Sequence, residues 1–298
     1  MKKGVLLAIG AYVLWALLPV YWKALQTVPA IQIIAHRFVW SVGFLVLLLL
    51  ARGEWKQFRQ EAFSRRNLLL FALSGGLLAV NWLTYIWGVN AGFVIETSLG
   101  YFINPLVSVL LGTLFLREKL RPLQWVPVGL AAVGVLYLTF TYGAVPWIAL
   151  VLAFSFGIYG LLRKTAPLGS LYGLALETLI VFLPAAVFLL LVEFQGAGVV
   201  GKVSAWEGAL LVLTGVATAL PLLLFSSAAR QINLSLIGIL QYIAPTGQFL
   251  LGVLVYREPF TAERLVGFAI IWAALILYTG ESLLVRRAAR APAPGSAG

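Results

Sequence analysis

The chain has 298 residues, of which 62% are hydrophobic and 10% are charged, with a mean hydropathy of +1.00 and a formal net charge of +11. These values lie far outside the range of ordinary soluble domains and predict an integral membrane protein. Cysteine is absent and His36 is the only histidine, which excludes a disulfide framework, a thiolate nucleophile and a zinc site.

Apolar segments of roughly 20 residues follow one another along the chain, and the breaks between them carry Pro, Gly or charge. Each segment has the length that a ~30 Å hydrocarbon core requires of a helix rising ~1.5 Å per residue. They predict ten membrane-spanning helices, at about residues 4–23, 30–51, 67–90, 97–116, 122–140, 144–162, 169–192, 207–229, 234–256 and 262–284. The predicted fold class is therefore an all-α integral membrane protein.

The two ends of the chain need separate treatment. The opening letters MKKG before an apolar run are also typical of a signal peptide. The apolar region from Gly4 to Trp22 is long enough to span a bilayer, however, and no A-x-A cleavage site follows it, so we predict that it is retained as the first helix. The segment 286–298 has too few apolar groups to fold, and we predict a disordered cytoplasmic tail there.

The distribution of Lys and Arg predicts the orientation in the membrane. With the N-terminus placed inside, 16 of the 21 basic residues fall on that side, four fall on the other, and Arg37 lies within a helix. The positive-inside rule then places both termini in the cytoplasm. Basic loops facing an anionic leaflet explain the pI of 10.1, and we expect the lipid bilayer, not nucleic acid, as the macroscopic partner.

The chain contains an internal duplication. A shift of 140 residues aligns Pro105–Leu120 with Pro245–Phe260 without a gap, and seven of the 16 positions are identical. This predicts two repeats of five helices each, at residues 1–141 and 142–285. Because five is odd, the second repeat must enter the membrane upside down relative to the first. Inverted repeats of this kind are typical of secondary transporters.

Several strings in the sequence resemble one family of membrane proteins. They include AHRFVWS at 35–41, NWLTYIWGVN at 81–90, SLGYFINPL at 98–106 and LQYIAPT at 240–246. The chain resembles, from Lys3 to about Tyr278, the RarD family, the chloramphenicol-sensitivity branch of the EamA-domain drug/metabolite transporters. The resemblance implies a ten-helix permease of two EamA repeats, with helices five and ten peripheral and the others around a central cavity.

Two charged residues, Arg37 and Glu177, lie deep inside predicted spans. The 140-residue shift places Arg37 on Glu177, and both are estimated to lie about 10–12 Å deep, from opposite faces. Because a lone charge in hydrocarbon costs at least ~2.5 kcal/mol, we predict that Arg37 and Glu177 face the cavity and interact, with Glu177 as the candidate for proton coupling. Alternatively, Arg37 extends to the outer interface. For His36, a hydrogen-bonded structural role and contact with substrate are both open.

A second group of polar and aromatic residues lies near Pro105 and Pro245 and in the third span. It supplies amides, hydroxyls and aromatic faces to a predicted substrate cavity, which suits a small amphipathic or aromatic solute better than a phosphate. The alternative is hydrogen bonding between helices at ~0.6 kcal/mol apiece. The group consists of Asn81, Trp82, Tyr85, Tyr101, Asn104, Gln241, Tyr242 and Gln248.

These features predict a secondary transporter that moves a small amphipathic metabolite or drug across the cytoplasmic membrane by alternating access. The alternative from another class is a membrane sensor or scaffold that does not transport. The sequence contains no HExxH motif, Walker loop or paired aspartates, so we expect neither an enzyme nor an ATP-driven pump, and no cofactor. The expected partners are a small-molecule substrate and a proton as candidate coupling ion.

Overall fold

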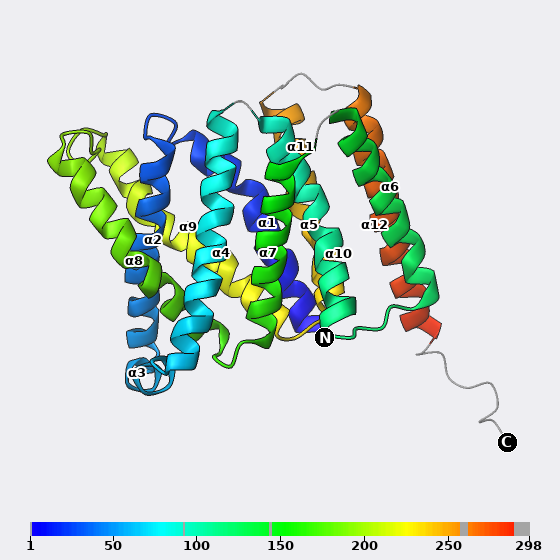
Figure 1. Cartoon of the computed structure of the whole chain (residues 1–298), viewed down its shortest axis with the longest axis horizontal. Coiled ribbons are helices and arrows are strands. Elements are labelled where there is room, and N and C mark those ends of the chain that lie inside the picture. The colour runs from blue at the N-terminus through cyan, green and yellow to red at the C-terminus, as the bar shows by residue number, and fades with distance from the viewer. Residues whose placement is uncertain (1, 92, 143–144, 257–261, 289–298) are drawn as a thin grey trace.

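The computed structural model describes residues 2–91, 93–142, 145–256 and 262–288, and these residues form helices and connecting turns without a strand (Figure 1). Nine segments are long and apolar enough to span a membrane among the described residues, and α12 adds a shorter apolar stretch at Leu265–Glu281. The main helices are α1 (Lys2–Lys23), α2 (Ala30–Ala51), α3 (Trp55–Ala62), α4 (Arg65–Asn90), α5 (Val94–Phe115), α6 (Trp125–Tyr142), α7 (Trp147–Thr165), α8 (Ser170–Phe194), α9 (Ala205–Ala229), α10 (Leu234–Gln241), α11 (Ile243–Leu250) and α12 (Ala262–Ala288). The predicted all-α membrane fold is confirmed.

The ninth predicted span is broken into three pieces. It contains α10, α11 and a π-helix, η2 (Leu251–Val255). Pro245 has no N–H to donate to the carbonyl of Gln241, and the break between α10 and α11 lies at that carbonyl. In the first repeat, by contrast, Pro105 lies inside the uninterrupted helix α5.

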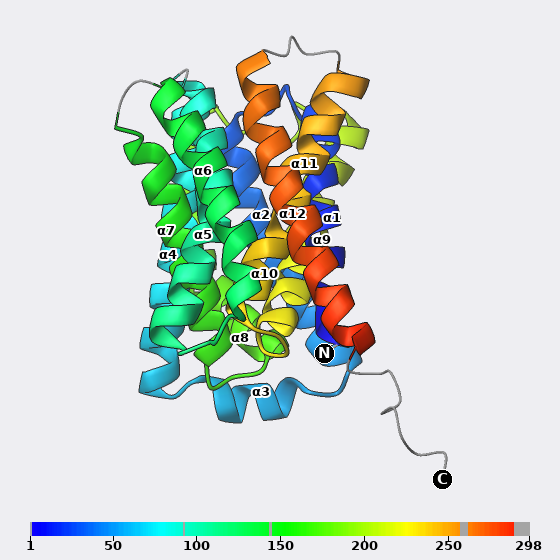
Figure 2. The same cartoon turned by 90° about the vertical axis from the view of Figure 1, so that its right-hand side faces the viewer.

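Two further features differ from the prediction. The segment predicted as a loop between the second and third spans contains the short helix α3, which lies across the end of the bundle (Figure 2) and buries Phe58 against Tyr172, with ring centroids 5.8 Å apart. The predicted tail at 286–298 begins inside α12, because that helix continues to Ala288, and residues 289–298 lie outside the described residues.

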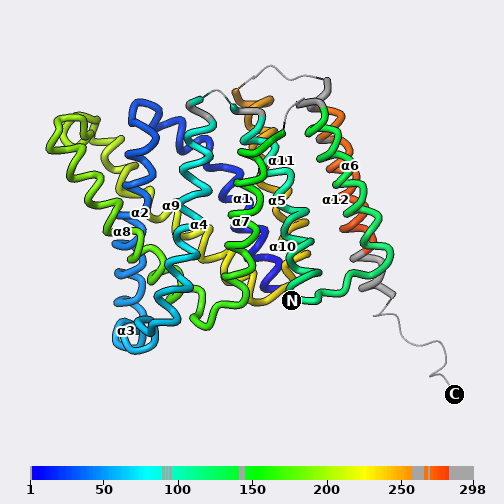
Figure 3. The backbone as a smooth tube through the Cα atoms, viewed as in Figure 1, coloured from blue at the N-terminus to red at the C-terminus, as the bar shows by residue number. Residues whose placement is uncertain are grey.

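The two halves of the chain run in opposite directions. Helix α1 begins at the face of the molecule where α3 lies, which we call the N-terminal face, whereas α7 begins at the opposite face (Figure 1). Helix α12 ends at the N-terminal face, and it lies beside α6 at one edge of the bundle (Figure 3). The fifth and tenth predicted spans, which are α6 and α12, are therefore peripheral, as the resemblance implied.

The packing of the helices repeats between the halves. Helix α1 packs on α9 as α7 packs on α4, and α2 packs on α9 as α8 packs on α4. Three pairs of equivalent helices contact each other directly, namely α2 with α8, α5 with α10, and α6 with α12. The Tyr242 hydroxyl also donates to the carbonyl of Phe102, its equivalent under the 140-residue shift. This exchange of contacts is what an inverted repeat requires.

Equivalent glycines bring equivalent helices together. A Cβ on Gly215 in α9 would lie 2.3 Å from the backbone of Trp40 in α2, and a Cβ on Gly75 in α4 would lie 2.9 Å from the Val181 side chain in α8. The shift of 140 residues relates the two glycines. Small residues allow this close approach of helices in membranes.

We expect Gly215→Ala to lower the stability of the protein by about 1–3 kcal/mol or more, because the added methyl would meet backbone atoms that cannot rotate away. The matched control is Gly208→Ala in the same helix, where an added Cβ meets nothing within 4 Å. Thermal unfolding of the detergent-purified variants measures the difference. Equal melting temperatures would show that α2 and α9 separate without cost.

Candidate functional site

A cavity of about 330 Å³ lies between the helices of the two repeats. Residues from seven parts of the chain line it. These are the second halves of α1 and α4, the start of α2, the first halves of α5 and α7, one residue of α9, and the junction of α10 with α11. Apart from Leu222 in the second half of α9, these segments lie toward the face opposite the N-terminal face, and we call this part of the molecule the cavity half. The part near the N-terminal face is the closed half.

Arg37 projects from α2 into the cavity half. Its guanidinium carbon lies 3.8 Å from the ring centroid of Trp82 and 4.9 Å from that of Trp22, and its Nε donates to the Thr218 hydroxyl at 2.9 Å. Arg37 is half-buried and lines the cavity. Stacking on aromatic faces compensates a cation for part of its lost hydration. The alternative in which Arg37 extends to the outer interface does not describe this geometry.

Four amide side chains also line the cavity, and three of them donate hydrogen bonds that join neighbouring helices. Asn81 donates to the carbonyl of Leu152 at 2.8 Å, and Asn104 donates to that of Ala153 at 3.0 Å. The third and fourth are Gln241 and Gln248, the latter donating to the carbonyl of Trp15. The two roles weighed from the sequence, lining a cavity and joining helices, therefore coexist.

Seven aromatic residues share the remaining wall with aliphatic ones. Tyr85 and Tyr101 contact each other edge to face, with centroids 5.7 Å apart, and Trp82 packs against Phe38 at 5.1 Å. Among the described residues that line the cavity there is no Asp, Glu or Lys, so Arg37 is the single ionised group of this lining. The wall thus combines one cation, several amides and aromatic faces.

Three predicted site residues lie elsewhere. Tyr242 is buried and hydrogen-bonds to Phe102, so it joins α5 and α10 rather than lining the cavity. His36 is 8% exposed, is not part of the lining, and its two ring nitrogens hydrogen-bond to no described residue. Glu177 lies in the closed half.

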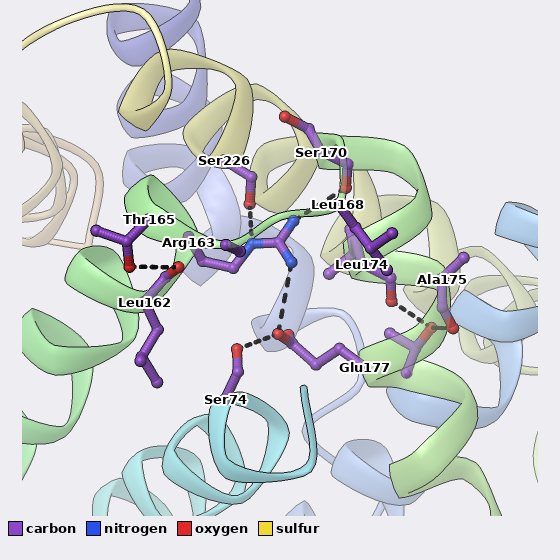
Figure 4. Close-up of polar contacts among 12 residues, drawn as sticks. Ser74, Leu162, Arg163, Thr165, Leu168, Ser170, Leu174, Ala175, Glu177 and Ser226 are labelled. Atoms are coloured by element: carbon purple, nitrogen blue, oxygen red, sulfur yellow. Dashed lines mark hydrogen bonds and ion pairs between the residues drawn. The ribbon is translucent and has the colours of Figure 1, made fainter. Parts of the chain in front are cut away.

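The predicted interaction of Arg37 with Glu177 is wrong. The Glu177 carboxylate lies 3.8 Å from the guanidinium of Arg163 and accepts a hydrogen bond from the Ser74 hydroxyl (Figure 4). Arg163 in turn donates to the Ser226 hydroxyl and to the carbonyl of Ser170, each at 2.9 Å. Arg163 and Glu177 are 2% and 1% exposed, so this is a fully buried ion pair.

Sequence reasoning missed Arg163 because it was counted among the loop residues. The predicted sixth span ended at residue 162, whereas α7 continues to Thr165, and one further turn directs the Arg163 side chain into the bundle. Arg163 and Glu177 lie near the facing ends of two helices joined by a short connection, and this spacing could have indicated that they pair.

A second charged cluster closes the same half. The Glu118 carboxylate accepts from the backbone N–H groups of Leu234 and Ser235, at 2.7 and 2.9 Å, and from the Ser235 hydroxyl at 2.7 Å. Lys164 lies 3.8 Å from Glu118 and also donates to the carbonyl of Ala229. Glu118 therefore satisfies the free N–H groups at the start of α10 and favours the dipole of that helix.

Comparisons with known proteins agree with this architecture. Residues 2–140 match the model of the EamA-like transporter family. The chain is 47% identical to "Uncharacterized transporter YojE" of Bacillus subtilis (strain 168), covering 97% of each chain. It is 46% identical to "Protein RarD" of Streptomyces exfoliatus, covering 97% of this chain and 92% of that protein.

One solved structure supports the fold independently. It is described as "Crystal structure of protein", superposes with a TM-score of 0.71, and covers 95% of this chain and 98% of its own, at 20% identity. At that identity it shows the fold alone. Together with the family match over residues 2–140, the near full-length relatives show that this chain belongs to the RarD family of EamA-like membrane transporters.

Proposed function

We propose that the chain is a secondary transporter that moves a small amphipathic solute through the cavity by alternating access. The observation that carries the proposal is the asymmetry between the two halves. The cavity half contains a cavity of solute size, whereas the closed half is filled by the Arg163–Glu177 ion pair and the Glu118 cluster. In an inverted repeat, exchanging the conformations of residues 1–141 and 142–285 opens one half as it closes the other.

The lining determines what kind of solute fits. One guanidinium, amide groups and tryptophan and tyrosine faces suit a solute with an apolar or aromatic body and few polar groups. The side-chain carbonyl oxygens of Asn104 and Gln241 have no hydrogen-bond partner among the described residues, and they supply acceptors close to the cavity. We propose Arg37, the aromatic residues and these amides as the substrate-binding residues.

We propose roles for two further predicted site residues, Glu177 and His36. Glu177 is a candidate for proton coupling because it is a buried carboxyl; its partner in this conformation is Arg163, not Arg37. His36 has buried, unpartnered nitrogens and is a candidate for a structural or substrate contact that forms in another conformation.

A comparison of metabolite uptake and release in cells with and without the protein should identify a solute, and flux of that solute is then measured in proteoliposomes. We expect saturable flux that is lost when a maleimide modifies Ala30→Cys, because Ala30 lines the cavity and the chain has no other cysteine. Modification of Val200→Cys, which is 66% exposed between α8 and α9, is the control. A sensor or scaffold would give no flux in any of these preparations.

We further propose that the protein lies in the cytoplasmic membrane with its N-terminal face toward the cytoplasm. The exposed Gln57 on α3 should then react as Gln57→Cys with an impermeant maleimide only after the cells are permeabilised, whereas Val200→Cys should react in intact cells. The reverse pattern would place both termini outside.

A further inference from the structure

The two halves of the molecule differ in charge at equivalent positions. The 140-residue shift relates Arg163 to Lys23 and Glu177 to Arg37. In the closed half, these positions carry an ion pair whose charged atoms are 3.8 Å apart. In the cavity half, they carry two cations. The acid that completes the closed half therefore has a cation as its counterpart beside the cavity.

Neither cation has an acidic partner within the part of the chain that the structure describes. Among the described residues, no carboxylate lies within 4.0 Å of Arg37 or Lys23. Arg37 is in contact with the rings of Trp22 and Trp82, and the Lys23 ammonium lies 3.8 Å above the ring of Tyr256. The Nε of Arg37 has a hydrogen bond to Thr218, but its two terminal nitrogens have none within the part of the chain that the structure describes.

Closing the cavity half therefore meets an electrostatic obstacle. If the first repeat adopts the packing that the second repeat shows now, the end of α1 approaches the first turns of α2, as the end of α7 approaches α8. Lys23 would then face Arg37 across the distance that now separates Arg163 from Glu177. Two cations repel at that distance, so this closure requires a negative charge beside Lys23 and Arg37, where the described residues place none in this conformation.

We propose that the solute supplies this negative charge, and that the substrate is an organic monocarboxylate with an aromatic or apolar body. This inference rests on the proposed transport function. The carboxylate binds the terminal nitrogens of Arg37 and, on closure, lies between Arg37 and Lys23 as Glu177 lies beside Arg163. Because one guanidinium faces the open cavity, it neutralises one negative charge, and this favours a monocarboxylate over a dicarboxylate. The rings of Trp82, Tyr85 and Tyr101 contact the body of the solute.

Charge reversal tests this inference without knowledge of the natural substrate. The probe is the rate at which a water-soluble maleimide labels Ala30→Cys in the detergent-purified, otherwise cysteine-free protein. Arg37→Glu supplies the missing anion to Lys23, and Lys23→Glu supplies it to Arg37. We expect each single reversal to slow labelling at least about tenfold, because the cavity half closes without solute.

Two controls separate the pairing from a simple loss of charge. Arg37→Gln removes the cation without providing an anion, and it should leave the cavity half open. The double change Lys23→Glu with Arg37→Glu places two like charges together again and should restore fast labelling. Val200→Cys reports the intrinsic labelling rate in every background. Fast labelling in both single reversals, or slow labelling in the double reversal, would overturn the inference.

A solute arm uses benzoate, phenylacetate and 3-phenylpropanoate, each compared with its neutral amide. At least one carboxylate should slow labelling of Ala30→Cys in the protein with native Lys23 and Arg37 by about tenfold more than its amide does. Protection by no carboxylate, or equal protection by the amides, would overturn the assignment of an anion.

A residue of the closed half distinguishes this failure from failure of the transport proposal. Ala229 at the end of α9 is fully buried, and labelling of Ala229→Cys should rise when the closed half opens. If charge reversal closes the cavity half while Ala229→Cys stays protected, the anion inference stands and alternating access fails. If the two positions exchange accessibility regardless of charge at Lys23 and Arg37, transport stands and the anion inference fails.

Discussion

Replacing either Arg163 or Glu177 alone by alanine should lower the free energy of unfolding by about 3–5 kcal/mol, because each change leaves the other charge buried without a partner. Both side chains are at most 2% exposed, so water cannot replace the lost partner without opening the bundle. Ser74, Ser226 and the carbonyl of Ser170 would remain, but they compensate a lone charge only in part. Unfolding of detergent-purified protein, followed by melting temperature and by denaturant titration, measures the loss.

The double change Arg163→Met with Glu177→Gln should recover most of this stability, because it removes both charges and keeps similar side-chain volumes. The matched control combines Arg37→Ala with Glu177→Ala. We expect the losses in that pair to add, since Arg37 and Glu177 lie in different halves and share no partner. Additive losses for Arg163 and Glu177, or strong coupling between Arg37 and Glu177, would contradict the arrangement in Figure 4.

The helices could be predicted from the sequence because lipid imposes a single requirement on length and hydropathy. Each span must satisfy its own backbone groups, so an apolar segment of about 20 residues can only become a helix. The inverted repeat was also predictable, since it depends on parity and on the match between Pro105–Leu120 and Pro245–Phe260. Helix α3 was not predictable on these grounds, because its eight residues are amphipathic and its burial depends on packing against Tyr172.

The site was predictable as a set of residues but not as a set of contacts. Depth along the membrane normal can be estimated by counting residues, and that estimate placed Arg37 and Glu177 at similar heights. Lateral position and side-chain direction cannot be counted in this way. Arg163 has the advantage of proximity, since α7 and α8 are joined by the short connection 166–169 and α7 extends one turn beyond its predicted end. The buried carboxyl therefore pairs with the neighbouring helix.

Replacing Glu118 by alanine should shift the protein from a closed to an open N-terminal half. The Glu118 carboxylate accepts two backbone N–H groups at the start of α10 and one hydroxyl, all from Leu234 and Ser235. Hydrogen bonds to a charged group contribute about 1.5–3 kcal/mol each, and loss of about 3 kcal/mol changes an equilibrium by roughly 150-fold. We therefore expect labelling of Ala229→Cys to rise at least about tenfold and that of Ala30→Cys to fall.

Two further variants show whether the effect belongs to the Glu118 cluster. Glu61→Ala removes an acid on the exposed face of α3, on the same side of the molecule, and should change neither rate. Gly112→Ala retains the Glu118 charge, but its added Cβ would lie 2.6 Å from a carboxylate oxygen and 2.8 Å from the Ser235 hydroxyl, so it should displace the contact and shift both rates in the same direction as Glu118→Ala. Suppose instead that Glu118→Ala and Gly112→Ala both lowered the melting temperature while Ala30→Cys and Ala229→Cys became accessible together. The Glu118 cluster would then stabilise the fold without determining which half is open. Opposite changes at the two positions, with the melting temperature retained, are the result expected of a contact that α5 and α10 break and re-form during transport.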